Sequence, residues 1–480
     1  MLKKPSNIPL CVDLDGTLIF SDTLIELLCR AIKISPLILL LLPFWLMKGR
    51  VNLKMQLAKR FSAYVNNLPF NEVLVDFLKR EKKGGRKIYL VTACEENLAK
   101  KIADKVGIFD DVWGTDEHLN LKGTAKANFL IGKFGEKNFI YAGNDTADIP
   151  VWRASAEIVL VNASRLVKNT AVRENPQKPF LVFDKQKTPF VFLRTIRIHQ
   201  WAKNFLIFIP LLLSHNFTNT GKILNCIAAF VAFGLCASAT YIINDLLDIE
   251  NDRSHHKKRF RPIPAGNIGF VVCAATVGVF FALAAFFAFS IDMRLMLMLL
   301  AYIIITLCYS FCLKKLIIVD IIALAFFYIF RLYFGAVAVD IPISHWFITF
   351  ATFIFLSLGA VKRYTEILKT KESSREKLSG RGYTVDDISI ISNIGVSAGL
   401  ISVLTYIIYI NYGANEYYRN PAVLLWGSFP LLYFILKIWI KASRNEVQDD
   451  PIVYAIKTKE NYLLAFIMLL IFIIARPISG

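Results

Sequence analysis

The feature that most constrains this chain is a series of apolar stretches in its C-terminal part. Beyond Arg194, nine of them lie near residues 204–214, 221–243, 268–290, 293–310, 316–338, 343–361, 387–411, 421–440 and 461–476. Most approach the roughly 20 residues that a helix needs to cross a bilayer. We therefore expect an all-α polytopic membrane domain of nine transmembrane helices over residues 191–480.

The basic residues indicate how such a domain is oriented. Lys and Arg concentrate in alternate loops, at residues 253–261, 314–315, 362–381 and 441–459. By the positive-inside rule these loops are cytoplasmic. The first ten residues, MLKKPSNIPL, lack the apolar run of a signal peptide. We expect a multi-pass protein of a bacterial-type cytoplasmic (inner) membrane, with its N-terminal domain in the cytoplasm.

The N-terminal part has a different pattern. Up to about residue 185, short β-branched runs such as KIYLVTA alternate with amphipathic segments, which is typical of βα units around a parallel sheet. We expect an α/β domain over residues 1–172. The basic, proline-containing stretch 173–190 is expected to be a linker.

The net charge and the cysteine content limit which molecules and metals the chain is expected to bind. The net charge is +19 while 55% of residues are hydrophobic, which favours anionic headgroups or phosphorylated substrates over nucleic acid. The eight cysteines form no CxxC pair, so no disulfide or zinc site is expected. A lipid bilayer is an expected partner, and assembly into a homo-oligomer stays open.

Four segments of the N-terminal domain carry groups suited to phosphate chemistry. IPLCVDLDGT presents two carboxylates at the end of an apolar strand, followed by a glycine that lets the loop curl around a phosphate. LVTA, NLKGTAKANFL and FIYAGNDTADIP follow in order. Their polar residues are Asp13, Asp15, Thr92, Lys122, Lys126, Asp145 and Asp148.

This set resembles the haloacid dehalogenase superfamily of phosphohydrolases, over about residues 8–165. The resemblance implies that Asp13 is the nucleophile and Asp15 the general acid/base. Thr92 would orient the phosphoryl group, and Lys126, or alternatively Lys122, would neutralise it. Mg²⁺ would be held by Asp13, the carbonyl group of Asp15 and Asp145, with Asp148 close behind. A decayed domain kept for regulation is the alternative.

The resemblance also implies that this Rossmann-like domain carries a helical cap at about 22–86. The expected cap contains a strongly apolar run, SPLILLLLPFWLM, over residues 35–47. It is too short to span a bilayer and is flanked by Lys33, Lys48 and Arg50. Two interpretations stay open, a buried cap core or contact with the membrane surface.

A second group of acids follows the second apolar stretch. Asn244, Asp245, Asp248 and Asp252 have NDxxDxxxD spacing, which places the three carboxylates on one helical face. Clustered acids near a bilayer normally need a cation. An oxygen-only cluster suits Mg²⁺, which in turn suits diphosphate.

Residues 190–480 resemble the UbiA superfamily of intramembrane prenyltransferases. The second acidic motif of that family is not intact, because its stretch offers only Asp320. The sequence looks like the branch that transfers phosphoribose onto a polyprenyl phosphate, as decaprenyl-phosphate phosphoribosyltransferases do. Such phosphorylated substrates need additional cations. The candidates are Lys203, Lys258, Arg261, Lys314, Arg331, Lys362 and Arg363.

These features predict a bifunctional enzyme that acts on phosphoribosyl diphosphate and polyprenyl phosphate. The membrane domain would make polyprenyl phosphoryl-5-phosphoribose, and the phosphatase domain would remove the 5-phosphate. One alternative is a UbiA-type prenyltransferase with a prenyl diphosphate donor, an aromatic acceptor and an independent phosphatase domain. A transporter with a regulatory domain is another, although it would not require the carboxylates.

Overall fold

The computed structural model describes residues 8–61, 67–116, 119–185, 189–214, 218–255, 257–373, 376–378, 380–447 and 450–475. The chain forms two compact units. The first contains Met1–Thr195 and Ile242–Ala274, and the second contains Ile196–Tyr241 and Ala275–Gly480. The chain therefore leaves the first unit after Thr195 and returns to it for residues 242–274.

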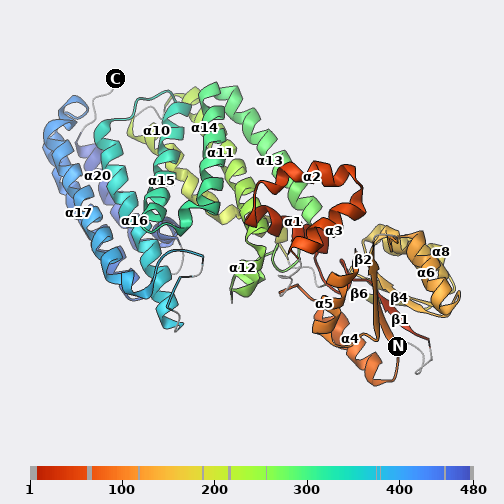
Figure 1. The fold of residues 1–480 in the computed structure, drawn as a ribbon. Helices are drawn as coiled ribbons and strands as arrows, with labels where there is room; N and C mark the ends of the chain where they lie inside the picture. The colour runs from red at the N-terminus through yellow and green to blue at the C-terminus, as the bar shows by residue number, and fades with distance from the viewer. Residues whose placement is uncertain are drawn as a thin grey trace. The chain divides into compact units, whose positions relative to one another are not determined.

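A six-stranded parallel sheet forms the centre of the first unit (Figure 1). Its strands are β1 (Leu10–Val12), β2 (Ile88–Glu95), β3 (Asp111–Thr115), β4 (Ile140–Gly143), β5 (Glu157–Val161) and β6 (Phe180–Phe183), in the order β3-β2-β1-β4-β5-β6. In the register, Leu10 lies opposite Ile88 on one side and Ile140 on the other. This confirms the predicted parallel α/β domain.

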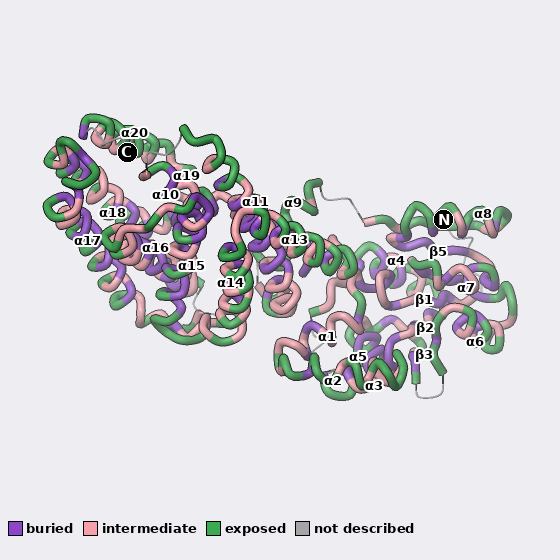
Figure 2. Tube along the Cα trace, turned by 90° about the horizontal axis from the view of Figure 1, so that it is seen from above, coloured by how far each residue is buried: buried purple, intermediate pink, exposed green. Residues whose placement is uncertain are grey.

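Alternate strand residues build two apolar layers, one on each side of the sheet. Leu10 and Val12 join the cluster that contains Leu98 of α5 (Glu96–Val106). Cys11 joins the other cluster, with Leu130 of α6 (Thr124–Phe134). The helices α7 (Ile149–Ala154) and α8 (Arg165–Glu174) also lie in this second layer. The central strands β1, β2, β4 and β5 are mostly buried, as Figure 2 shows for β1, β2 and β5.

The cap consists of α1 (Thr23–Ile34), α2 (Ile38–Met47) and α3 (Arg50–Phe61). The next helix, α4 (Glu72–Lys83), belongs to the sheet layer instead. Its Leu74 packs in the cluster of Leu10 and Val12, and its Phe77 ring lies 5.0 Å from that of Phe183 in β6. The end of the stretch expected to be cap, about 22–86, is therefore part of the core.

The structure also bears on two further expectations from the sequence, the linker and the apolar run of the cap. The stretch 173–190, expected to be a linker, includes β6, because the alternating FLVF segment pairs with β5. The apolar run of the cap forms α2, whose side chains are mostly exposed. Phe44 is 64% and Met47 85% exposed, whereas Ile38 is buried.

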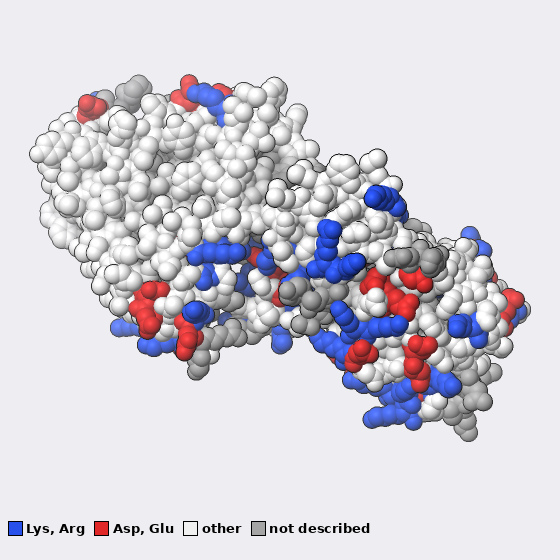
Figure 3. Space-filling view, viewed as in Figure 1, with Lys and Arg blue, Asp and Glu red and all other residues white. Residues whose placement is uncertain are grey.

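The second unit is helical. Its elements, together with those of the connecting segments, are α9 (Val191–Thr195), η3 (Ile198–Phe208), α10 (Ile209–Leu213), α11 (Thr220–Leu247), α12 (Ile249–Ser254), η4 (Lys258–Phe260), α13 (Phe270–Ile291), α14 (Met293–Phe311), η5 (Leu313–Lys315), α15 (Val319–Ala338), α16 (His345–Glu372), η6 (Val385–Asp387), α17 (Ile388–Tyr412), η7 (Ala414–Glu416), η8 (Pro421–Gly427), α18 (Ser428–Ser443), α19 (Pro451–Lys457) and α20 (Lys459–Ile474). Figure 3 shows few charged side chains over the middle of these helices and more towards their ends.

Seven helices of the described residues are long and apolar enough to cross a membrane. The expected count of nine is not confirmed. The first expected span is broken into η3 and α10, where Pro210 stands at the start of the α-helix. The last, α20, has 16 residues, about 24 Å at 1.5 Å per residue, which is shorter than a bilayer core of about 30 Å.

Candidate functional site

The first site lies at the carboxyl end of β1. Asp13 follows that strand directly, and its carboxylate accepts a hydrogen bond from Nζ of Lys126 on α6 at 3.0 Å. Lys126 also donates to Oη of Tyr141 at 2.7 Å, and Tyr141 donates to Asp148 at 2.9 Å. Gly16, at φ +74°, turns the loop beside this group, where a Cβ atom would lie 2.1 Å from Nδ2 of Asn144.

Burial sets the electrostatics of this carboxylate. Loss of water raises the pKa of Asp13 to about 6, although Lys126 acts in the opposite direction. Burial lowers the pKa of Lys126, but the neighbouring Asp13 and Asp148 raise it more, so that the pKa lies above its ordinary value. The lysine therefore stays charged beside Asp13, in position to neutralise a bound phosphoryl group.

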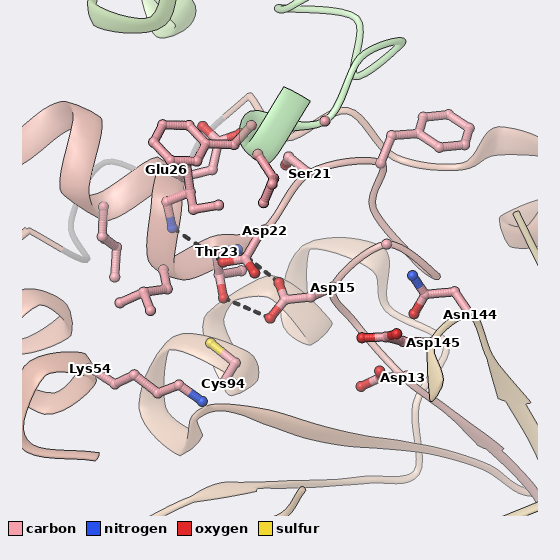
Figure 4. A pocket seen from close by; sticks show the side chains of 18 of the residues that line it. Asp13, Asp15, Ser21, Asp22, Thr23, Glu26, Lys54, Cys94, Asn144 and Asp145 are labelled. Atoms are coloured by element: carbon pink, nitrogen blue, oxygen red, sulfur yellow. Dashed lines mark hydrogen bonds between the residues drawn. The ribbon is translucent and has the colours of Figure 1, made fainter. Parts of the chain in front are cut away.

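Asp15 occupies a different environment from Asp13. Its carboxylate accepts hydrogen bonds from the backbone N–H of Thr23 at 2.8 Å and from the Thr23 hydroxyl at 3.1 Å. Burial, and then the neighbouring Asp22, raise the pKa of Asp15 to about 8. Figure 4 shows Asp15 turned towards Thr23, whereas Asp13 and Asp145 lie next to one another. A carboxyl group that stays protonated near neutral pH suits a general acid.

The other predicted residues of this site divide into two groups. Lys122 and Asp145 line the same pocket as Asp13, but Lys122 is exposed and Lys126 is the lysine that contacts Asp13. Thr92 is buried within β2 and accepts a hydrogen bond from the backbone N–H of Cys94 at 3.0 Å. Thr92 is absent from the described lining of the pocket.

Asp148 has a supporting geometry. One carboxylate oxygen accepts from Tyr141, and the other accepts from the backbone N–H groups of Asn144 and Asp145 at 2.9 and 3.1 Å. Asp145 accepts from the N–H and hydroxyl of Thr146. These bonds use both oxygens of Asp148, so Asp13 and Asp145 are better placed to hold Mg²⁺. Their oxygen-only donor set fits that ion.

Sequence reasoning missed Lys54. This residue lies on α3 of the cap, lines the pocket and donates to the carbonyl of Ala93 at 2.7 Å. Burial lowers its pKa. In Figure 4 its side chain extends towards Cys94. No spacing rule connects a cap lysine with a strand end 39 residues away, so only the fold could identify it.

The acidic motif of residues 244–252 also belongs to the first unit. The helix α11 ends at Leu247, and Asp248 is the N-cap of α12, so the expected helical face is interrupted at Asp248. Arg261 contacts Asp245 at 3.3 Å and Asp252 at 2.7 Å. Nζ of Lys258 lies 4.0 Å from Asp252.

This motif presents an oxygen-only donor set that fits Mg²⁺ chemically. The carboxylates of Asp245, Asp248 and Asp252 are at present balanced by basic side chains, Lys33 pairing with Asp248 at 3.0 Å. Within the described residues, no three His, Cys, Asp or Glu side chains stand close enough together to hold a metal ion. Asn244, predicted to bind substrate, is the first residue of the motif. Its backbone carbonyl accepts a hydrogen bond from the backbone N–H of Asp248 at 2.9 Å.

In the second unit, two of the predicted cations meet at a carboxylate that sequence reasoning missed. Asp450 contacts Nζ of Lys203 at 2.7 Å and Nζ of Lys362 at 3.1 Å. Tyr328 donates to the same carboxylate at 3.0 Å. Asp450 is the N-cap of α19. In the sequence it therefore looks like an ordinary helix-capping residue and not like part of a charged site.

Arg331 joins this region through Asn204, the residue after Lys203. Its Nε donates to Oδ1 of Asn204 at 2.9 Å, and its guanidinium lies 4.8 Å from the ring centroid of Phe233. Arg331 is 3% exposed. A guanidinium held inside a helical unit by neutral partners is suited to bind an anion.

Asp320 and Arg363 form a separate cluster. Both side chains are fully buried, and Arg363 pairs with Asp320 and with Glu366. Arg381 contacts Asp320 at 2.8 Å, and the hydroxyl of Tyr309 donates to the carboxylate of Asp320 at 2.7 Å. The acid that replaces the second motif is therefore neutralised by two arginines. Lys314 lies in η5 and is half-buried.

Known proteins resemble both parts of the chain. A model of the UbiA prenyltransferase family matches residues 205–470. The chain is 35% identical over 476 residues to the uncharacterized protein y4nM of Sinorhizobium fredii, covering 98% of this chain and 91% of that protein. It is 30% identical over 252 residues to the decaprenyl-phosphate phosphoribosyltransferase of Mycobacterium tuberculosis, covering 51% of this chain and 80% of that enzyme.

A solved phosphoserine phosphatase aligns with 38% of this chain and 95% of its own, at 16% identity and a TM-score of 0.28. The UbiA resemblance predicted from the sequence is confirmed. The chain belongs to the UbiA prenyltransferase family.

Proposed function

We propose that this chain is a bifunctional membrane enzyme. Its UbiA domain transfers 5-phosphoribose from phosphoribosyl diphosphate to a polyprenyl phosphate and releases diphosphate. Its phosphatase domain then removes the 5-phosphate to give polyprenyl phosphoryl-ribose. The active sites face the cytoplasmic side of a bacterial inner membrane, where the water-soluble donor is available.

The observation that carries this proposal is the excess of cations over acids inside the second unit. Lys203 and Lys362 share a single carboxylate, that of Asp450. Arg331 adds a cation whose partner Asn204 is neutral. The arginines Arg363 and Arg381 are balanced by two acids, Asp320 and Glu366, and do not add to the excess. A donor with a 5-phosphate and a diphosphate, and an acceptor that is itself a phosphate, need fixed cations of this kind. The identity with the mycobacterial enzyme supports the same substrates.

In the transfer step, a phosphate oxygen of the lipid attacks the anomeric carbon of the donor. The bond between that carbon and the diphosphate oxygen breaks, and diphosphate leaves. Lys203, Lys362 and Arg331 would bind the phosphate groups and offset their charge. Asp245, Asp248 and Asp252 would hold Mg²⁺ only after leaving their basic partners and approaching one another, and the ion would then neutralise the diphosphate.

In the hydrolytic step, the Asp13 carboxylate attacks phosphorus, and the bond to the ribose oxygen breaks. Asp15 donates its proton to that leaving oxygen, then accepts a proton from the water that hydrolyses the aspartyl-phosphate. Lys126, 3.0 Å from Asp13, offsets the negative charge. Asp13 and Asp145 would hold a second Mg²⁺, which when bound reduces repulsion between carboxylate and phosphate.

Incubation of the purified full-length protein with phosphoribosyl diphosphate, a polyprenyl phosphate and Mg²⁺ tests this proposal. Mass spectrometry of the lipids should show a phosphoribosyl product first and a ribosyl product, lighter by one phosphate, later. Prenylation of an aromatic acid without consumption of phosphoribosyl diphosphate would support a prenyltransferase instead. Solute flux without either transfer would support a transporter.

A further inference from the structure

The pocket over Asp13 extends well beyond the phosphate-binding groups. It has a volume of about 650 Å³. Its charged lining residues include Asp13, Asp15, Glu26, Lys54 and Lys126. The rest is largely apolar, and much of it comes from residues 246–273, which we call the pocket wall. The pocket wall contributes Leu246, Ile249, Ile263, Phe270, Val272 and Cys273 to the lining.

An ion pair joins the cap to the pocket wall. The guanidinium of Arg253, on α12, donates to both carboxylate oxygens of Glu26, on α1, at 2.7 and 3.0 Å. The two side chains are 8% and 13% exposed, so solvent screens the pair only weakly. Nε of Arg253 also donates to the carbonyl of Pro264 at 2.8 Å. Arg253 therefore positions the turn of the pocket wall against the cap.

Two more ion pairs link the same helices. Arg30 pairs with Glu250, and Lys33 pairs with Asp248 at 3.0 Å. Each basic residue lies on α1 and each acidic residue on or beside α12, whereas Glu26 and Arg253 have the opposite arrangement. This alternation of charge specifies one orientation of the two helices, because a shifted pairing would oppose like charges.

The turn at residues 262–266 has its own contact with the phosphatase loop. Gly266, at φ +64°, packs so closely on Phe20 that a Cβ atom would lie 2.5 Å from that of Phe20. Nζ of Lys185 lies 3.7 Å from the centroid of the Phe20 ring and donates to the carbonyl of Ala265 at 2.7 Å. Phe20 follows the Asp13–Gly16 loop, so the pocket wall is fitted to the catalytic loop as well as to the cap.

We propose that residues 246–273 complete the phosphatase pocket as a wall for an apolar chain, positioned by the Glu26–Arg253 pair. The pocket then selects phosphate esters that carry a lipid tail. This inference rests on the proposed phosphatase activity and names its substrate class. An apolar extension beside a phosphate site gives no advantage to a small water-soluble ester, but it removes the tail of an amphiphile from water.

The test compares two substrates with the full-length protein in detergent micelles. One is a farnesyl phosphodiester of ribose 5-phosphate, and the other is p-nitrophenyl phosphate. Glu26→Arg and Arg253→Glu should each raise KM for the lipid ester by about tenfold or more, since each places two like charges opposite one another in a mostly buried position. The rate on p-nitrophenyl phosphate should stay within about twofold of wild type, because the catalytic loop is unchanged.

The double variant Glu26→Arg/Arg253→Glu restores the pair with reversed polarity, so KM should return towards the wild-type value. Arg153→Glu is the matched control, since its pair with Glu174 joins α7 and α8 away from the pocket. It should leave both activities unchanged.

Equal effects on the two substrates, or no effect of the single variants on the lipid ester, would overturn the assignment of the pocket wall. Failure of the double variant to recover would overturn the role of the ion pair. If the wild type hydrolyses only p-nitrophenyl phosphate, the proposed function itself fails.

Discussion

Asp450→Asn removes the charge that balances two lysines inside the second unit. The Asp450 side chain is 5% exposed, and that of Lys203, 2.7 Å away, is 10% exposed. Loss of one partner of a buried ion pair costs about 3–5 kcal/mol, because the other charge is left without compensation. For a unit of this size, about 2–4 °C per kcal/mol gives a fall of the unfolding midpoint of about 6–20 °C.

The assay heats the full-length protein in detergent and measures the monodisperse fraction by size-exclusion chromatography. Asp340→Asn is the control, because it makes the same chemical change in a pair with Arg294 whose Asp340 side chain is 86% exposed. Solvent screens that pair, so its midpoint should barely move. The double variant Asp450→Asn/Lys203→Met also removes one unpaired ammonium and should recover part of the loss. A wild-type midpoint for Asp450→Asn would refute the reasoning, as would a double variant less stable than the single one.

Four more outcomes are expected. Asp13→Asn should stop phosphate release while phosphoribosyl transfer continues, so the phosphorylated lipid should accumulate in mass spectra. Asp245→Ala should stop transfer but spare hydrolysis of supplied phosphoribosyl lipid. Chelation of Mg²⁺ should stop both reactions and added Mg²⁺ should restore them, and transfer in metal-free buffer would contradict this. Serine at Leu40, Leu41 and Phe44, which are exposed on α2, should impair hydrolysis of the lipid in a bilayer but spare p-nitrophenyl phosphate. Equal loss would show that α2 supports the cap instead of contacting the membrane.

The order of motifs along the chain was sufficient to predict the α/β domain and the position of its site. Asp13 and Asp145 follow β1 and β4, which are neighbours in a parallel sheet. Carboxyl ends of parallel strands meet at one edge, so the sequence could bring these groups together without knowledge of side-chain positions. The apolar stretches likewise determined a helical membrane domain, because length and composition decide whether a segment can cross a bilayer.

Only the tertiary structure decided which of several equivalent residues meet. Lys122 and Lys126 are both plausible partners of Asp13, but the turn of α6 buries Lys126 beside it and leaves Lys122 exposed. Asp450 is 247 residues from Lys203 in the chain, and no local pattern predicts that pair. The contact of Arg253 with Glu26 is equally remote. Periodicity and composition act over a few residues, whereas ion pairs depend on how distant elements pack, so local patterns determined the elements and packing determined the pairs.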